Sequence, residues 1–335
     1  MTTPLEVRRE PKIAVAIPCF NEAAAIGKVV AEFQASLPAA EIVVLDNNST
    51  DGTGDLARNL GARVERVLRQ GKGHAVRAAF ELLRDRDVLV LVDGDGTYPA
   101  EAAPSLVAPV LEGEADMVVG ARQPETGARA MSPIRGAGNL LIRLAFRLLM
   151  GARSGDLLSG YRAFSQRFLQ SVALQSEGFE IETELAIAAA SRGLRTMEVS
   201  IPYRPRIAGT VSKLRAFRDG QRILRTIVLS AVQHHPLRIA GIWVLIITLL
   251  SLPFLGYEMV RWSWGIALAV GMVAIAWVRA RSRRDESHPG GSEPRGLSPG
   301  TWNPGPSDER GFASDETVAG PNGRTAASAE PQSGA

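Results

Sequence analysis

The chain has 335 residues, of which 45% are hydrophobic and 22% charged, with one Cys and four His. This apolar fraction supports a folded core and excludes a chain that is disordered throughout. A single Cys excludes a disulfide framework and a thiolate zinc site, and a net charge of +3 argues against a nucleic-acid binder.

The first 235 residues alternate short β-branched runs with stretches of helical pattern. We predict strands at 13–17, 41–45, 64–68, 88–92 and 117–119, and helices at 24–37, 53–60, 74–83 and 100–111. Strands that alternate with helices favour βαβ units and a mostly parallel sheet. The sequence therefore predicts an α/β domain over residues 12–235, after an N-terminal segment at 1–11.

The first two predicted strands end in polar motifs. Residues 17–22 read Ile-Pro-Cys-Phe-Asn-Glu and residues 46–53 read Asp-Asn-Asn-Ser-Thr-Asp-Gly-Thr, each just before a helix. Ligands bind at the carboxyl ends of strands in open α/β folds, and a helix N-terminus offers donors to an anion. Two readings stay open: an ordinary turn with helix caps, or a ligand site in which Asp46 accepts hydrogen bonds from a ribose or base.

A glycine-rich stretch, Gln-Gly-Lys-Gly-His at 70–74, opens the third predicted helix. Glycine lets a backbone approach a phosphate closely, and Lys72 supplies a positive charge. The stretch is not a Walker A loop, which has a different spacing. It is therefore a weak indication of a phosphate site when taken alone.

The fourth predicted strand ends in Asp-Gly-Asp-Gly-Thr at 93–97. Two carboxylates this close are costly unless a cation or a ligand offsets their repulsion. Mg²⁺ typically binds one or two carboxylates and leaves its other positions to phosphate and water. We therefore predict a divalent-cation site here; the alternative is an Asp/Gly turn between a strand and a helix.

Residues 237–279 differ in composition from the domain before them. The stretch 239–257 holds 19 residues without a charge and 262–278 holds 17, close to the roughly 20 residues that cross a bilayer. We predict two transmembrane helices joined as a hairpin, with aromatic residues at 243, 257, 262, 264 and 277 as an interfacial belt. The alternative is a pair of buried core helices.

Basic residues flank this hairpin on both sides, at 218, 222, 225 and 238 and again at 279, 281, 283 and 284. The positive-inside rule then predicts a multi-pass protein of the cell membrane with the α/β domain and both termini in the cytoplasm. The stretch 213–225 reads as a basic amphipathic helix on the anionic leaflet, or as the solvated face of a core helix. Residues 282–335 read as a disordered tail, because they are rich in Pro, Gly and Ser.

Together, the three motifs at the strand ends and the glycine-rich stretch resemble the family 2 glycosyltransferases of GT-A fold. The resemblance covers residues 12–235 and rests on the order and spacing of P-C-F-N-E, D-N-N-S-T-D-G-T, G-K-G and D-G-D-G-T. The G-K-G, D-L-L-S-G-Y-R at 156–162 and G-F-E-I-E-T-E at 178–184 are more specifically similar to dolichyl- or polyprenyl-phosphate sugar synthases. The resemblance to family 2 glycosyltransferases implies a GT-A nucleotide-diphospho-sugar transferase fold with a mostly parallel sheet.

The resemblance also implies a nucleotide pocket at the ends of the first two strands and at the glycine-rich stretch. Its members are Pro18, Asn21, Glu22, Asp46, Ser49, Asp51 and Lys72. Asp93 would contact the ribose or the sugar, and Asp95 would bind the metal on the diphosphate. Asp93 is also a candidate ligand of this metal, which would be Mg²⁺ or Mn²⁺. Thr97 stands where such synthases often carry a Gln as a further metal ligand, so the chain departs from the pattern there.

Three basic residues are candidates for binding the acceptor. Arg122, Arg135 and Lys213, together with Asn139, lie in segments that match acceptor-phosphate segments of the relatives. From chemistry alone, a lipid phosphate at a membrane surface requires cationic and preferably bidentate partners. The alternative for each of these residues is a solvated side chain or a local salt bridge.

The expected activity is metal-dependent, inverting transfer of a hexose from a nucleotide-diphosphate sugar to a polyprenyl (dolichyl or undecaprenyl) phosphate. A second hypothesis changes the acceptor to a sugar hydroxyl, a glycolipid or a soluble phosphorylated acid, and requires a general base among Glu182, Glu184 and Asp156. A third hypothesis is a non-catalytic sugar-nucleotide sensor or membrane scaffold, against which the intact pair of aspartates argues.

Overall fold

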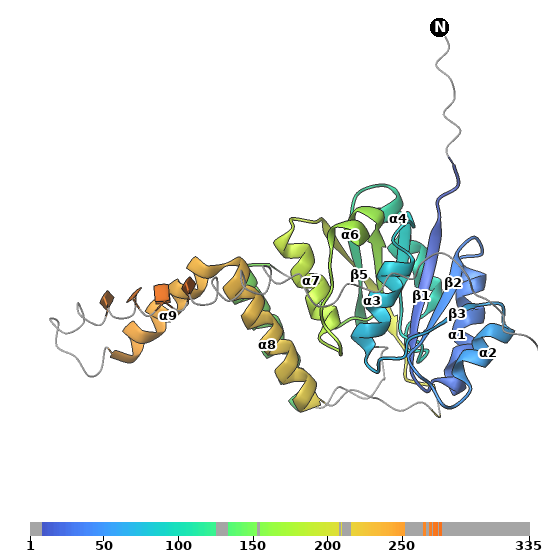
Figure 1. The fold of residues 1–335 in the computed structure, drawn as a ribbon, viewed down its shortest axis with the longest axis horizontal. Helices are drawn as coiled ribbons and strands as arrows, with labels where there is room; N and C mark the ends of the chain where they lie inside the picture. The colour runs from blue at the N-terminus through green and yellow to red at the C-terminus, as the bar shows by residue number, and fades with distance from the viewer. Residues whose placement is uncertain are drawn as a thin grey trace, which may run out of the picture. The chain divides into compact units, whose positions relative to one another are not determined.

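A computed structural model describes residues 9–124, 133–152, 155–207, 209, 216–251, 264–265, 268–269, 271–273 and 275–276. The chain divides into two units, 1–285 and 286–335, and the second unit, with most of the predicted tail, lies outside the described residues. The first half of the described chain contains β1 (Ile13–Cys19), α1 (Ala23–Ser36), β2 (Glu41–Asp46), α2 (Thr53–Asn59), β3 (Arg63–Arg66), α3 (Lys72–Leu82), β4 (Val88–Leu91), η1 (Ala100–Ala102) and α4 (Ala103–Leu111). The second half contains β5 (Met117–Pro124), α5 (Pro133–Met150), β6 (Arg162–Ser165), α6 (Gln166–Ser171), α7 (Ile181–Ser191), β7 (Thr196–Tyr203), α8 (Ala216–His234) and α9 (Pro236–Ser251) (Figure 1).

The strands form one seven-stranded sheet in the order β3-β2-β1-β4-β6-β5-β7. Strands β3, β2, β1 and β4 run parallel to their neighbours, β6 runs antiparallel to β4 and β5, and β7 runs parallel to β5. The sheet is therefore mixed but mostly parallel, as predicted. Because β1, β2 and β4 are parallel, the loops that follow them all lie at the carboxyl edge of the sheet, where ligands bind in such folds.

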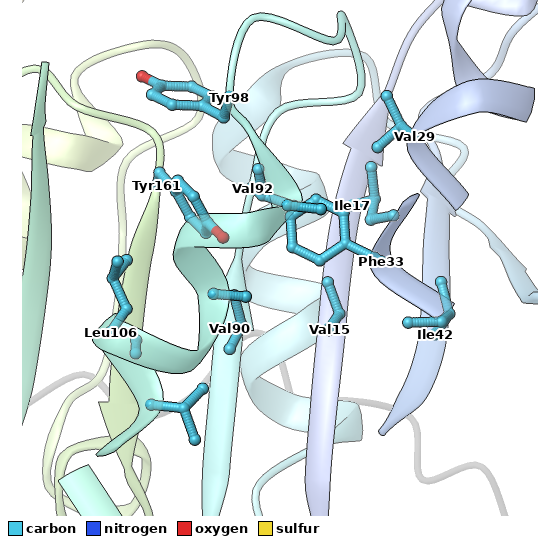
Figure 2. Packing of buried hydrophobic residues seen from close by; sticks show 14 of the residues in the cluster. Val15, Ile17, Val29, Phe33, Ile42, Val90, Val92, Tyr98, Leu106 and Tyr161 are labelled. Atoms are coloured by element: carbon cyan, nitrogen blue, oxygen red, sulfur yellow. The ribbon is translucent and has the colours of Figure 1, made fainter. Parts of the chain in front are cut away.

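Both faces of the sheet are buried, which explains why the strands read as continuous apolar runs. Val15 and Ile17 of β1 point to one face, in a cluster that also includes Phe33 of α1 and Leu106 of α4 (Figure 2). Ala14 points to the opposite face, in a second cluster that includes residues of α3, α6 and α7. Two layers of helices thus hold the sheet and the loops at its edge.

Some predicted elements differ from the observed ones. The predicted helix 100–111 begins as the 3₁₀ turn η1 and continues as α4, which has Pro104 in its first turn and Pro109 inside. A proline fits the first turn of a helix because the N–H that it lacks has no helical partner there. Strand β3 ends at Arg66 and not at residue 68 as predicted.

Helices α5, α7 and α8 enclose a third apolar cluster. Phe146 of α5, Ile187 of α7, and Ile223 and Ile227 of α8 are buried in it. The predicted amphipathic helix at 213–225 corresponds to α8, whose apolar side packs against protein while Arg218, Arg222 and Arg225 are exposed.

Within the described residues, no single helix is both long and apolar enough to cross a membrane. The helical segments Phe217–His234 and Pro236–Leu250 reach the length and hydropathy of a membrane span only when they are taken together, and the chain bends by 110° between them. Helix α9 covers much of the first predicted span, and most of the second, at 262–278, lies outside the described residues.

Candidate active site

The loops after β1 and β2 hydrogen-bond to each other at the carboxyl edge of the sheet. The Asn21 N–H donates to Ser49 Oγ at 3.0 Å, the Thr50 N–H donates to Asn21 Oδ1 at 2.9 Å, and the Ser49 N–H donates to Asp46 Oδ1 at 2.9 Å. Asn21 has a φ of 52°, a left-handed conformation in which Asn is enriched. These contacts bring three members of the predicted nucleotide pocket together, next to the end of β1, where Pro18 lies.

Asp51 caps a helix that is remote from it in sequence. Its Oδ2 accepts the Ala23 N–H of the first turn of α1 at 2.9 Å, and its Oδ1 accepts the Thr53 N–H at 3.0 Å. The Glu22 N–H donates to Thr53 Oγ1 at 2.9 Å. Burial raises the pKa of Asp51, but the hydrogen bonds from Thr53 and Ala23 outweigh it and leave the pKa below its ordinary value. Capping therefore accounts for part of this polar motif.

Lys72 lies between two carboxylates at the end of β4. Its Nζ is 2.5 Å from Asp93 Oδ1 and also forms an ion pair with Glu182 Oε1, which comes from the first turn of α7. The ring of Phe179 lies over the ammonium, 5.7 Å from Nζ to the ring centroid. Burial lowers the pKa of Lys72, but the two carboxylates outweigh it and raise the pKa. The pKa of Glu182 is raised because the carboxyl is buried, although Lys72 opposes this.

The glycines on either side of Lys72 pack against protein backbone. The Gly71 N–H donates to Asn47 Oδ1 at 2.7 Å, and the Gly73 N–H donates to the carbonyl of Glu177 at 2.9 Å. A Cβ atom at either glycine would collide with the backbone around residues 176–177. These two N–H groups already have protein acceptors, and Lys72 is the part of the stretch that faces Asp93 and Glu182.

Asp95 is buried, and its two carboxylate oxygens have different partners. Oδ1 accepts the Thr97 N–H at 3.1 Å and the Thr97 hydroxyl at 2.6 Å. Oδ2 is 2.6 Å from Nη1 of Arg206, a residue that follows β7. Thr97, at the position where the resemblance implies a further metal ligand, thus binds the carboxylate itself.

This arrangement fits a divalent cation at Asp95. Its donor is a hard carboxylate oxygen, which Mg²⁺ and Mn²⁺ accept, and Oδ2 already binds a positive charge in the form of a guanidinium. Among the described residues, no group of three or more His, Cys, Asp or Glu is placed to hold a metal. The remaining ligands of such a cation would come from a diphosphate and water.

Arg122, at the end of β5, forms a bidentate ion pair. Its Nε donates to Asp156 Oδ2 at 2.7 Å and its Nη2 to Asp156 Oδ1 at 2.8 Å, and its guanidinium lies 5.3 Å from the ring centroid of Tyr203. Burial raises the pKa of Asp156, but the bonds from Arg122 outweigh it and the pKa is lowered. Of the other predicted acceptor residues, Arg135 lies in α5 with its side chain outside the described part, Asn139 lies in α5, and Lys213 is outside the described residues.

Two arginines that the sequence did not mark as candidates support the site. Arg162 is fully buried, and its guanidinium donates to the carbonyls of Leu157 at 2.7 Å and Ser159 at 2.9 Å. It thereby fixes the loop before β6, where the backbone of Gly160 packs against Asp93. Arg206 is the second, and in the sequence it is one of two arginines, at 204 and 206, that follow β7.

Comparison with known proteins gives three findings. A model of glycosyl transferase family 2 matches residues 14–150. The glycosyltransferase AglJ of Haloferax volcanii is 37% identical over 225 residues, which are 67% of this chain and 74% of that protein. The dolichyl-phosphate hexose transferase of the same organism is 38% identical over 216 residues, which are 64% of this chain and 92% of that protein.

A solved structure is also similar to this fold. It is glucosyl-3-phosphoglycerate synthase from Mycobacterium tuberculosis in complex with Mn²⁺, uridine-diphosphate-glucose and phosphoglyceric acid, with a TM-score of 0.52 and 25% identity. The similarity covers 67% of this chain and 79% of that chain. The predicted GT-A-like α/β fold with a mostly parallel, mixed sheet is thereby confirmed.

Proposed function

Since this chain belongs to glycosyl transferase family 2, we propose that it transfers a hexose from a nucleotide-diphosphate sugar to a polyprenyl phosphate. It is a glycosyltransferase similar to the polyprenyl-phosphate sugar synthases, and the polyprenyl acceptor is the proposed part. The observation that supports a nucleotide-sugar donor is the pair of aspartates after the buried strand β4. Asp93 and Asp95 each lie beside a cationic side chain.

In the proposed reaction the residues of the chain bind and orient the two substrates. Asn21, Asp46 and Ser49 would hold the nucleoside, and Lys72 and Asp93 would lie toward the sugar. Asp95 would hold Mg²⁺ or Mn²⁺, which when bound neutralises charge on the leaving diphosphate. The acceptor phosphate oxygen bonds to the anomeric carbon as the bond to the diphosphate oxygen breaks, and the diphosphate leaves with the electron pair. In-line attack inverts the anomeric centre.

The partners of the candidate bases favour an acceptor that is already an anion. Asp156 is bound to Arg122, Glu182 to Lys72, and Glu184 accepts the N–H groups of residues 175 and 176 at 2.7 and 2.8 Å. Each of these three carboxylates thus already has a cation or a backbone N–H as its partner. A phosphate monoester does not need that step, because its second pKa of about 6 leaves it largely ionised at neutral pH.

Arg122 is the described residue that we propose for the acceptor phosphate. Its guanidinium is planar and bidentate toward Asp156, which is the geometry that a phosphate also accepts. We propose Arg135 and Lys213 as further partners of the same phosphate, on the basis of the resemblance.

Exposed leucines support a lipid surface next to this domain. Leu140, Leu141, Leu144 and Leu148 of α5 are each between 49% and 59% exposed and recur at helical spacing, while Phe146 on the same helix is buried. A contiguous apolar face of this kind marks an interaction site on a folded domain. We propose that it rests on the membrane, and that α9 with the residues up to 279 forms a transmembrane hairpin with the domain and both termini on the cytoplasmic side.

The test is a transfer assay with membranes that contain the full chain. Undecaprenyl phosphate, Mg²⁺ or Mn²⁺ and one radiolabelled nucleotide sugar from a panel are supplied in each reaction. We expect label in an acid-labile lipid with one donor, and loss of that label with EDTA. If none of the donors gives a labelled lipid, the proposal of a polyprenyl phosphate acceptor is contradicted.

A second candidate acceptor is a soluble phosphorylated acid, because the similar solved structure holds phosphoglyceric acid. The same panel with 3-phosphoglycerate in place of the lipid distinguishes the two. A labelled water-soluble product with 3-phosphoglycerate, together with no labelled product in the assay with lipid, would favour this second function.

A further inference from the structure

The segment after β7 lies across the carboxyl edge of the sheet. The Arg204 N–H donates to the carbonyl of Thr97 at 2.9 Å, and the Arg204 guanidinium pairs with Glu32 of α1 at 3.4 Å and with Glu101 of η1 at 2.9 Å. Ile207 packs so closely on Gly96 that a Cβ atom there would lie 3.0 Å from Ile207 Cγ1. Residues 204–207 are therefore anchored on both sides of the loop that carries Asp95.

Arg206 lies within this anchored segment and binds the one oxygen of Asp95 that the loop leaves open. Thr97 takes Oδ1, and the guanidinium of Arg206 takes Oδ2 at 2.6 Å. The Asp95 side chain is 5% exposed, whereas Arg206 is 35% exposed. The buried carboxylate is thus the fixed partner of this pair, and the arginine is the partner with room to move.

A metal bound to Oδ2 of Asp95 would lie close to this guanidinium. A divalent cation lies about 2.1 Å from its carboxylate oxygen, and two positive groups on one oxygen repel each other. We propose that Arg206 is a positioning residue: it is the counter-cation of Asp95 in the metal-free protein, the metal displaces it, and the displaced guanidinium binds the donor's diphosphate. This inference rests on the proposed function in taking Asp95 as the metal ligand.

The exchange predicts that metal and diphosphate bind cooperatively. Without a diphosphate, the metal must break the Arg206–Asp95 pair and leaves the arginine without its partner. With a diphosphate present, the arginine gains charge-assisted hydrogen bonds to phosphate oxygens in return. Because coupling between two ligands is reciprocal, the metal raises diphosphate affinity by the same factor.

The test measures Mn²⁺ binding to the purified full chain in detergent, by the electron paramagnetic resonance of free Mn²⁺. Mn²⁺ is titrated alone and with saturating inorganic pyrophosphate as the diphosphate probe. For Arg206→Gln we expect Mn²⁺ alone to bind about tenfold more tightly than to the wild type, and pyrophosphate in the presence of Mn²⁺ to bind about tenfold more weakly. A loss of packing alone would not move the two affinities in opposite directions.

Two further variants control this experiment. Arg204→Gln alters the same segment but not the Asp95 pair, so its affinity for Mn²⁺ alone should stay within about threefold of the wild type. Asp95→Asn should lose the site, and Mn²⁺ binding that survives this change would overturn the inference. So would unchanged or weaker binding of Mn²⁺ alone by Arg206→Gln. These are binding measurements, so a negative result for lipid transfer leaves them standing and shows that only the acceptor proposal has failed.

Discussion

At the residue scale, the charged side chains of the site that the structure describes are paired with one another or with the backbone. Lys72 forms ion pairs with Asp93 and Glu182, Arg206 forms an ion pair with Asp95, and Arg162 donates to backbone carbonyls. A buried ion pair adds little net stability, but the loss of one partner is costly because it leaves an uncompensated charge. The consequences of substitution at Lys72 are therefore predictable in both stability and activity.

We predict that Lys72→Met lowers the free energy of unfolding by about 3–5 kcal/mol and lowers kcat/KM by about two orders of magnitude. The substitution leaves Asp93 and Glu182 near each other without a cation. The double variant Lys72→Met/Glu182→Gln should regain part of the stability, since one carboxylate is gone, but not the activity. Chemical unfolding and the transfer assay measure the two effects, and a double variant no more stable than the single one contradicts this account.

The Arg122–Asp156 pair predicts a pH-dependent contribution to stability. The folded-state pKa of Asp156 is lowered, so the pair stabilises the fold above the unfolded value of about 3.9 and loses this effect as pH falls through the folded pKa. Asp156→Asn should therefore cost about 2 kcal/mol at pH 7 and progressively less below about pH 4. Urea unfolding of both proteins across this range checks the prediction; a cost that does not change with pH means that the charge of Asp156 is not its source.

At the element scale, the packing of residues 176–177 on the start of α3 depends on glycine. We predict that Gly73→Ala destabilises the protein by about 1–3 kcal/mol, because the added methyl meets the backbone of residues 176 and 177. Alanine is otherwise the better helix former by about 1 kcal/mol, so the sign of the effect is diagnostic.

Gly220→Ala is the matched control for that prediction. Gly220 is also helical, in α8, but a Cβ atom there meets no other atom within 4 Å. This variant should be as stable as the wild type or slightly more so. Thermal unfolding of both variants compares a crowded and an open glycine, and equal stabilities would contradict the packing role of Gly73.

Among the strands, β6 and β7 are the two that the sequence does not predict, and neither is a continuous apolar run. Strand β4 is four buried apolar residues and is found directly, whereas β7 is largely exposed at the sheet edge and β6 begins with the charged Arg162. The ends of β1, β2 and β4 could be assigned to one edge because parallel strands share it. The pairing of Arg206 with Asp95 could not be predicted from the sequence, because the tertiary fold brings these two segments together.

At the scale of the whole molecule, the catalytic edge and the proposed lipid surface must act together. The proposed acceptor phosphate is attached to a chain that dissolves in the bilayer, so in the proposed reaction the domain would hold its basic residues close to the headgroups. The exposed leucines of α5 offer the apolar contact for this, and Arg143 and Arg147 on the same helix are exposed and carry the charge that anionic lipids attract.

This placement predicts an effect on the lipid substrate alone. The double variant Leu144→Gln/Leu148→Gln should raise KM for undecaprenyl phosphate in vesicles by about three- to tenfold, because two half-exposed leucines lose contact with lipid. Activity on a short-chain, water-soluble polyprenyl phosphate should stay within twofold of the wild type, since the catalytic edge is unchanged. The control Leu56→Gln/Leu111→Gln replaces leucines of similar exposure on α2 and α4, and it should leave both activities as they are. If the α5 variant lowers activity on both substrates equally, the leucines support the fold and not the membrane contact.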